Sequence, residues 1–199
     1  QQAEIWIEVV KPKAQRRPSL LKEYMDSTQA ALTTVDKISS ALALSVIHED
    51  STFDHLLAIK QAAWLLRNTA GDASLVVSNG YITGTISQEG LQSYMKSVGG
   101  IDAAWNALQL SLAGIQLPPA LSATLAAAKT AYFEEQYVKL RDDLAKTLAA
   151  GQKPDMTANQ WSPLTVARLG SAVKVAEAAL DAAKEHAQGQ HSAAVASLV

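Results

Sequence analysis

The sequence predicts an all-α protein in which antiparallel helices pack as a bundle. Alanine and leucine are abundant and only 6% of the residues are aromatic, a composition that favours helix. Apolar residues recur at spacings of three and four along five segments of about 30 residues, the period of one buried helix face. The expected fold class is an antiparallel up-and-down bundle of the four-helix type with long first and last helices, or two short bundles stacked on each other.

Composition narrows the range of functions. The 199 residues suit one domain spanning 1–199, and the net charge of -2 gives no basic surface for nucleic acid. The absence of cysteine excludes disulfides and thiol chemistry, and it is compatible with an oxidising compartment such as a periplasm. No apolar stretch reaches the roughly 18 residues needed to span a bilayer. Because the chain starts with Gln rather than Met, we expect a processed protein or a piece of a longer one.

Residues 1–18 form a lead-in to the first long helix. The segment IWIEVV could be a short strand, but no second strand is predicted to pair with it. We therefore expect the end of a helix, interrupted by Pro12 and Pro18. A basic cluster follows, which is either solvated or, beside a membrane, able to contact anionic head groups. Its members are Lys11, Lys13, Arg16 and Arg17.

The first long helix is expected over residues 19–50, with Ser19 as its N-cap. A strict four-three spacing runs along it, as in a coiled-coil seam. Thr28 and Ser39 are polar positions inside this seam, where they satisfy backbone carbonyls or line a small polar pocket. The seam positions are Leu21, Met25, Thr28, Leu32, Val35, Ser39, Leu42 and Val46.

The second helix is expected over residues 52–79, capped by Ser51 or Thr52 after a polar turn. Gly71 inside it would allow close approach of a neighbouring helix or a ligand. Asn79-Gly80 is a turn signal that should end the helix. The expected buried stripe is Leu56, Ile59, Ala63, Leu66, Ala70, Ala73 and Val77.

The third helix, over residues 87–116, should start at Ser87 and be kinked or broken at Gly99-Gly100. The fourth is expected as one segment over residues 120–150. Its stripe would be Ala126, Thr130, Phe133, Tyr137, Leu140 and Leu144. Its charged residues would form a solvated outer face, made of Lys139, Arg141, Asp142, Asp143 and Lys146.

The last helix is expected over residues 160–199, with Pro163 in its first turn. The expected seam is Val166, Leu169, Val173, Ala176, Leu180 and Ala183. Trp161 could pack as a hydrophobic staple just before this helix.

The sequence holds no recognisable catalytic or metal-binding motif. His186 and His191 are five residues apart, which does not place both on one helix face, and no HExxH, P-loop, GxSxG or GxGxxG is present. We therefore expect no enzyme activity, no metal and no cofactor.

The best candidates for ligand contact lie on the second helix, in the segment AWLLRNTAGD. Trp64 and Arg67 are neighbours across one turn at the edge of the buried stripe, with Asn68 and Asp72 beside them. Arg67 could extend into water along its stem or turn inward to bind a carboxylate with its planar fork. Trp64 could equally be a core residue.

A second candidate group comes from later in the chain. Trp161 and Arg168 lie two turns apart on the last helix, and Tyr132 could bring its hydroxyl toward the bundle interior. Tyr132 could instead be an interface aromatic with its hydroxyl in water.

Four short segments resemble the all-helical extracytoplasmic sensor domain of bacterial methyl-accepting chemotaxis proteins, a module that also occurs on histidine kinases and diguanylate cyclases. They lie within residues 19–187 and read ALALSVIHEDSTF, AWLLRNTAGDAS, IDAAWNALQ and QWSPLTVARLGSAVKVAEAALDAAKEHA. The resemblance implies a periplasmic domain of an inner-membrane protein that works as a homodimer. Both ends would continue into membrane helices absent here, and a helix shift would carry the signal.

Three functions remain open from the sequence. The first is a sensor in which Arg67 contacts a small anionic or carboxylate-bearing ligand. The second is a ligand-free bundle that docks a periplasmic protein or responds to mechanical or membrane state. The third is a structural bundle unrelated to signalling. Two ends at one membrane also require an even number of passes, so one of the five segments should be broken, at Pro18 or Gly99-Gly100, unless two bundles are stacked.

Overall fold

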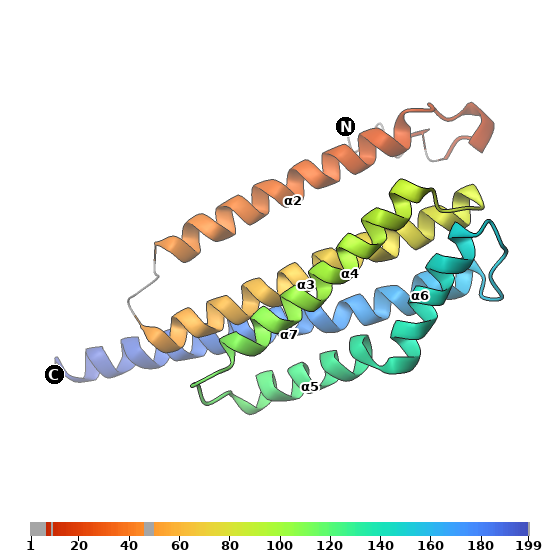
Figure 1. Ribbon diagram of the computed structural model, residues 1–199. Coiled ribbons are helices and arrows are strands. Elements are labelled where there is room, and N and C mark those ends of the chain that lie inside the picture. Colours follow the sequence, from red (N-terminus) through yellow and green to blue (C-terminus); the bar gives the residue numbers. More distant parts are fainter. Residues whose placement is uncertain (1–6, 9, 46–49, 199) are drawn as a thin grey trace. The chain divides into compact units, whose positions relative to one another are not determined.

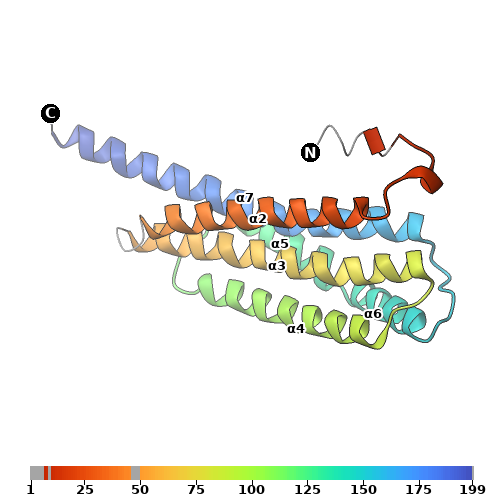
Figure 2. The same ribbon diagram turned by 90° about the horizontal axis from the view of Figure 1, so that it is seen from above.

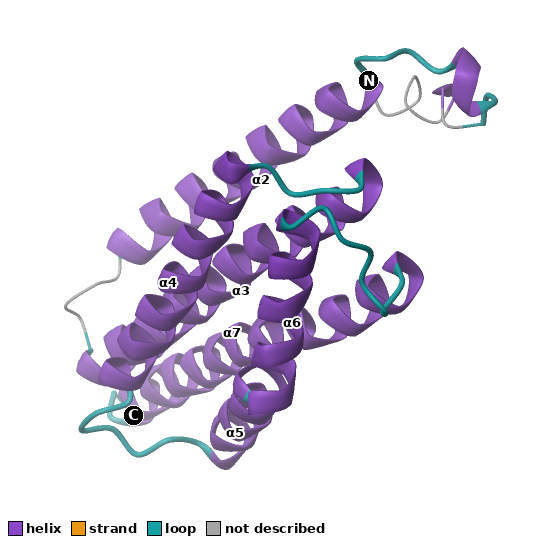
Figure 3. Cartoon of the chain, turned by 45° about the vertical axis from the view of Figure 1, so that its right-hand side comes forward, coloured by secondary structure: helices purple, strands orange, loops and turns teal. Residues whose placement is uncertain are grey.

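The computed structural model describes residues 7–8, 10–45 and 50–198. The described residues form six α-helices, one short 3-10 helix and no strand, which confirms the all-α class (Figure 3). They divide into two compact units, Gln1–Ile47 and His48–Val199. The predicted strand-or-helix segment near Trp6 lies partly outside the described residues, and Ile7 and Glu8 within it are helical. The first two residues of the polar turn expected at residues 48–52 also lie outside the described residues.

The first unit consists of the 3-10 helix η1 (Lys13–Gln15) and α2 (Leu20–Leu44). Ser19 occupies the N-cap of α2 as expected, but its hydroxyl donates to Glu23 Oε1 at 2.7 Å instead of accepting a backbone N–H. The basic cluster before α2 is partly neutralised by ion pairs, because Lys11 pairs with Glu8 and Arg17 with Glu23.

The second unit holds five helices, one of which packs against three of the others. α3 (Ser51–Thr83) runs antiparallel to α4 (Gln88–Ser111) and α7 (Ala158–Ala196) and packs most extensively on these two (Figures 1 and 2). α5 (Pro119–Phe133) packs on α7, whereas α6 (Glu135–Ala149) packs mainly on α3 and only lightly on α4.

The buried stripe predicted for α3 is confirmed at every position. Leu56, Ile59, Ala63, Leu66, Ala70, Ala73 and Val77 are all at most 2% exposed. The helix boundaries differ from those predicted. Asp50, rather than Ser51 or Thr52, caps the helix by accepting the Phe53 N–H at 2.9 Å. Gly80 does not end the helix, because α3 continues to Thr83 and stops at Gly84, whose φ of 81° is left-handed.

The segment predicted as one helix over residues 120–150 is two helices, so it is this segment, among the five predicted, in which the helix is interrupted. Glu134, with φ -59° and ψ 129°, interrupts the helix between α5 and α6, so that α6 turns away from α5 in Figure 1. The predicted stripe is wrong before the break, since Ala126 and Thr130 are exposed. The break shifts the helical phase, and the buried side of α5 is instead Leu121, Leu125, Ala128 and Tyr132.

The break is not at either predicted place. α4 is continuous through Gly99-Gly100, and Pro18 precedes α2. Gly100 serves helix packing instead: a Cβ added there would lie 3.1 Å from Thr69 Cγ2 of α3.

α7 begins earlier than predicted. Thr157 and Gln160 form a capping box that starts the helix at Ala158, which leaves Pro163 inside the helix and makes Trp161 a helical core residue rather than a staple before it. The predicted seam is wrong at Val166 and Leu180, which are 64% and 45% exposed. The side facing the core is instead built largely of alanine, at positions Ala172, Ala176, Ala179, Ala182 and Ala183.

Specific contacts fasten the two ends of the second unit. At the end where α3 starts, His186 Nε2 of α7 lies 3.0 Å from Asp50 Oδ2. At the other end, the Tyr81 hydroxyl donates to the Met156 carbonyl at 2.8 Å, and the Ile86 N–H donates to the Leu148 carbonyl at 3.2 Å. The α7 helix then extends past the start of α3 (Figures 1 and 2). None of the helices in the described part combines the length and apolar character needed to cross a membrane.

Candidate functional site

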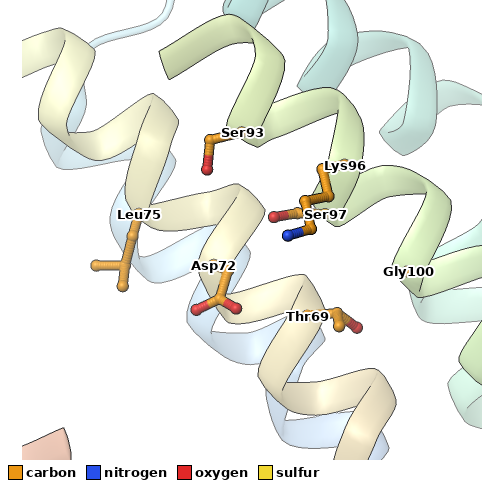
Figure 4. A pocket seen from close by; sticks show the side chains of 7 residues that line it. All are labelled: Thr69, Asp72, Leu75, Ser93, Lys96, Ser97 and Gly100. Carbon is orange, nitrogen blue, oxygen red and sulfur yellow. The ribbon is translucent and has the colours of Figure 1, made fainter. Parts of the chain in front are cut away.

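A polar groove of about 410 Å³ lies between α3 and α4 and is open to solvent on one side; we call it the α3–α4 groove. Asp72 projects toward it from α3, and Ser93, Lys96 and Ser97 project from α4 (Figure 4). Thr69, Leu75 and Gly100 complete the lining. The groove therefore offers one carboxylate, one ammonium group and the hydroxyls of Ser93 and Ser97, whereas the Thr69 hydroxyl donates to the Leu65 carbonyl of its own helix at 2.8 Å.

The helix contact beside the groove explains its position. Gly100 lets α4 approach α3 at Thr69, and both residues line the groove. The lining residues on each helix follow the helical period: Thr69, Asp72 and Leu75 are three residues apart, as are Ser93 and Lys96, and Ser97 and Gly100.

The charged groups of the groove are not paired with each other. Among the described side chains, neither Asp72 nor Lys96 has an ion-pair partner within 4 Å. Partial burial raises the pKa of the Asp72 carboxyl, and the charge of Arg67 acts in the opposite direction. Two opposite charges that remain unpaired across a small groove can each bind the complementary end of a ligand.

Of the residues predicted on α3, only Asp72 lines this groove. Arg67 is half-buried, and its Nη1 lies 3.4 Å from Asn68 Oδ1 and beside Gly71, so Gly71 makes room for this side chain. Trp64 and Asn68 are also half-buried. The arginine thus runs along its own helix and does not reach the groove lining.

A second polar cluster, absent from the prediction, is buried where α4 meets α6. Arg141 is only 3% exposed, so its predicted place on a solvated outer face is wrong. Its Nε donates to the Tyr94 hydroxyl at 3.0 Å and to Asp142 Oδ1 at 3.1 Å. The Tyr94 hydroxyl donates in turn to Asp142 Oδ1 at 2.6 Å. The guanidinium also lies 6.0 Å from the Tyr94 ring and 5.9 Å from the Tyr132 ring.

Burial governs the protonation of this cluster. It raises the pKa of Tyr94 and of Tyr132 far above the ordinary value of a phenol. Burial alone would lower the pKa of Arg141, but the surrounding Tyr94, Tyr132 and Asp142 outweigh it and the net shift is upward. Arg141 therefore carries its charge inside the protein, and the tyrosines remain neutral donors.

The predicted residues Tyr132, Trp161 and Arg168 come together around Tyr137. The Tyr132 ring meets the Tyr137 ring edge-on with centroids 5.4 Å apart, and Trp161 stacks on Tyr137 at 6.3 Å. Trp161 is fully buried and its indole N–H donates to Ser78 Oγ at 3.2 Å. Tyr132 is 2% exposed, so its hydroxyl does not lie in water.

Arg168 holds the broken end of α5. Its guanidinium donates to the Ala131 carbonyl and lies 3.3 Å from Glu134 Oε2, while its Cζ sits 4.3 Å from the centre of the Tyr137 ring. The Ala131 carbonyl is one of the last in α5 and has no helical partner, because the helix stops at Phe133. Arg168 therefore stabilises the break through its two terminal nitrogens, whereas its buried Nε has no hydrogen-bond partner among the described residues.

The sequence could have indicated part of this arrangement. Ser93, Lys96 and Ser97 share one polar side of α4, and Thr69 and Asp72 share one side of α3, but the pattern of each helix does not say which side faces which. In the described part of the chain no three His, Asp or Glu side chains gather as a metal site would require. Comparisons with models of known protein families, with curated proteins and with solved structures found no match.

Proposed function

We propose that this chain is the ligand-sensing helical module of a bacterial transmembrane signal transducer, and that a small polar molecule binds in the α3–α4 groove. The observation that carries the proposal is the pair of unpaired opposite charges, Asp72 and Lys96, on two different helices of one groove. A ligand with a cationic and an anionic end would complement both. The two opposite charges, together with the hydroxyls of Ser93 and Ser97, favour a small zwitterion over the purely anionic ligand expected from Arg67.

The helix arrangement supports a sensor of the antiparallel up-and-down four-helix type. We infer that α5 and α6 together make one pass that is broken at Glu134, so that the second unit has four passes. An even number of passes returns the chain to the end where it entered. The contact between Asp50 at the start of α3 and His186 near the end of α7 fits this arrangement. The resemblance to periplasmic chemoreceptor domains requires both ends of the module at one membrane, and the second unit alone fits this requirement, whereas α2 of the first unit is a fifth segment outside this count. Membrane anchors and a homodimer are further parts of the proposal.

The position of α3 suggests how binding would be relayed. α3 packs on both α4 and α7, and its buried stripe shares a core with residues of both helices. A ligand that draws α3 and α4 together favours one packing of α3 against α7 over another, and only that difference in affinity can shift the equilibrium. α7 would carry the displacement toward the output part of the receptor.

Binding is tested by calorimetry and thermal shift with a panel of small zwitterions, monocarboxylates and primary amines. We expect the zwitterions to bind best, and Asp72→Asn or Lys96→Gln to weaken them about 10- to 100-fold, the value of one charge-assisted hydrogen bond. Asp102→Asn and Lys129→Gln are matched controls, because both side chains are exposed and neither lines the groove. Unchanged affinity in both groove variants would refute the site.

The relay is tested separately with spin labels. The chain has no cysteine, so Ala58→Cys on α3 and Lys184→Cys on α7 would be the only labelling sites, and both positions are exposed. Addition of a bound zwitterion should change the distance distribution between the labels. If saturating ligand does not change this distance distribution, the protein binds the ligand but does not relay binding from α3 to α7. The sequence after Val199 in the full gene then distinguishes a chemotaxis receptor from a histidine kinase or a diguanylate cyclase.

A further inference from the structure

A second groove, of about 330 Å³, lies between α4 and α6; we call it the α4–α6 groove. It exists because α6 packs mainly on α3 and touches α4 only lightly. Its wall is built from the carbon-rich side chains Leu91, Met95 and Val98 of α4 and Ala145 of α6. Met95 is 66% exposed, so the wall is accessible from solvent.

One end of the α4–α6 groove is polar and rigidly held. The Asp142 carboxylate and the Tyr94 ring form this end. Asp142 Oδ1 accepts two hydrogen bonds, one from the Tyr94 hydroxyl and one from Arg141 Nε, and it lies 3.1 Å from Arg141 Nη2 in an ion pair. Its other oxygen, Oδ2, has no hydrogen-bond partner among the described residues, although a carboxylate oxygen can accept two. The side chain is 34% exposed, so water or a ligand can reach it.

The charges around this end determine the kind of donor that fits. The negative charge of Asp142 is balanced by Arg141 at 3.1 Å, and the exposed Lys146 adds a positive charge at the rim. The net charge of the three groups is positive, so a cationic ligand gains nothing from approaching. An uncharged hydroxyl group can donate to Asp142 Oδ2 without being repelled by the positive charges of Arg141 and Lys146.

We propose that the α4–α6 groove is a binding site for a small uncharged phenol, with the phenol hydroxyl donating to Asp142 Oδ2 and the ring packed against Leu91, Met95 and Val98. The thioether of Met95 is well suited to contact a ring edge, and the ammonium group of Lys146 can lie over a ring face. The site is distinct from the α3–α4 groove, on the other side of α4, and does not depend on the function proposed above.

The three methionines of the chain allow ligand binding in the α4–α6 groove to be measured selectively, because only one of them lines the groove. Met25 is in α2, Met95 lines the α4–α6 groove and Met156 is in the α6–α7 loop. With methyl-¹³C methionine, the intact protein should show three signals, assigned by single Met→Leu variants. Titration with 4-ethylphenol should shift the Met95 signal to saturation and leave the signals of Met25 and Met156 in place.

The matched probe 4-ethylanisole tests the hydrogen bond without changing the protein. It has the same ring but no hydroxyl donor, so we expect binding to be about tenfold weaker, as for one hydrogen bond to a charged acceptor. The ammonium probe 4-ethylbenzylamine should also bind more weakly than the phenol. Equal affinity for the phenol and the anisole, or tighter binding of the amine, would overturn the proposal, as would a Met95 signal that does not move.

A filled groove provides the protein-side test. Val98→Trp should occupy the space against Leu91 and abolish the Met95 shift, whereas Leu110→Trp, at a 76% exposed position of the same helix, should leave it unchanged. Thermal melting establishes that both variants are folded. Persistence of the shift in a folded Val98→Trp protein contradicts the site, and if that variant does not fold, the comparison of the two probes in wild-type protein decides.

Discussion

Arg141 shows how one buried charge can organise the contact between two helices. It is placed on α6 among Lys139, Asp142, Asp143 and Lys146, a run that by pattern alone is a solvated face. In the structure its guanidinium lies between the rings of Tyr94 and Tyr132 and shares the hydroxyl of one of them with Asp142. The sequence could not indicate this, because Tyr94 lies 47 residues away in the chain and Tyr132 lies on the other side of the helix break at Glu134.

Arg141→Met should destabilise the second unit by about 3 kcal/mol, because it removes one partner of a buried charge pair and leaves the Asp142 carboxylate with the Tyr94 hydroxyl alone. Lys139→Met is the matched control on the exposed side of α6 and should change the free energy of unfolding by less than about 0.5 kcal/mol. Urea denaturation followed by circular dichroism measures both. Equal stabilities for the two variants would mean that Arg141 is solvated after all.

The buried tyrosines predict a loss of stability in alkali. Burial raises the pKa of Tyr94, Tyr132 and Tyr137 in the folded protein, so the unfolded state releases their protons first. Their contribution is complete below the unfolded value of about 10 and is lost as the pH rises above it. Absorbance at 295 nm should show these phenols ionising together with unfolding, whereas Tyr94→Phe should reduce the slope of stability against pH. Titration of all phenols in the folded protein would contradict this.

At the scale of the element, the sequence predicted where helices form but not where a helix is interrupted. The period of α3 identified its whole buried stripe, because seven apolar residues at alternating spacings define one face without reference to any neighbour. The break at Glu134 left no such mark, since no glycine or proline is there. It depends on Arg168 from α7 to satisfy the Ala131 carbonyl, and this contact spans 37 residues of chain.

Glycines of α3 and α4 provide a matched pair of substitutions. Gly80→Ala should destabilise the protein by about 1–3 kcal/mol, because the new Cβ would lie 2.6 Å from Ile86 Cγ1 and 3.1 Å from Leu148 Cδ1. Gly99→Ala, with nothing within 4 Å of the new Cβ, should stabilise α4 by about 0.5–1 kcal/mol. Thermal or urea unfolding compares them. Effects of the same sign would show that Gly80 is not a contact point.

At the scale of the whole molecule, the sequence predicted the all-α class and most of the buried positions of α3. It predicted only Asp72 among the residues of the α3–α4 groove, because the pairing of one helix side with another is a tertiary property. Alanine in α7 added a further difficulty, because its small side chain is equally compatible with a buried and an exposed position. The predicted seam was right at Ala176 and Ala183 but included Val166 and Leu180, which are larger and exposed.

The contact between Asp50 and His186 makes the stability of the second unit depend on pH in the acid range. The His186 imidazole, with its Nε2 at 3.0 Å from Asp50 Oδ2, and then the hydrogen bond from the Phe53 N–H lower the pKa of Asp50. A lowered carboxyl pKa stabilises the fold above the unfolded value of about 3.9 and ceases to do so as the pH falls through the folded value. The difference in stability between wild type and Asp50→Asn should therefore shrink between pH 5 and pH 2. It should be smaller throughout in a His186→Ala background, and a difference that does not vary with pH would contradict the contact.

The alanine seam of α7 has a mechanical consequence. Each buried side chain at Ala172, Ala176, Ala179, Ala182 and Ala183 is a single methyl group, so this surface lacks the tall ridges that lock larger side chains into register. A small axial slide of the helix replaces one methyl contact with an equivalent one and opens little empty volume. We therefore expect α7 to slide along its axis at low energetic cost, and we expect its contacts with Asp50 and Glu134, made by His186 and Arg168, to limit this movement.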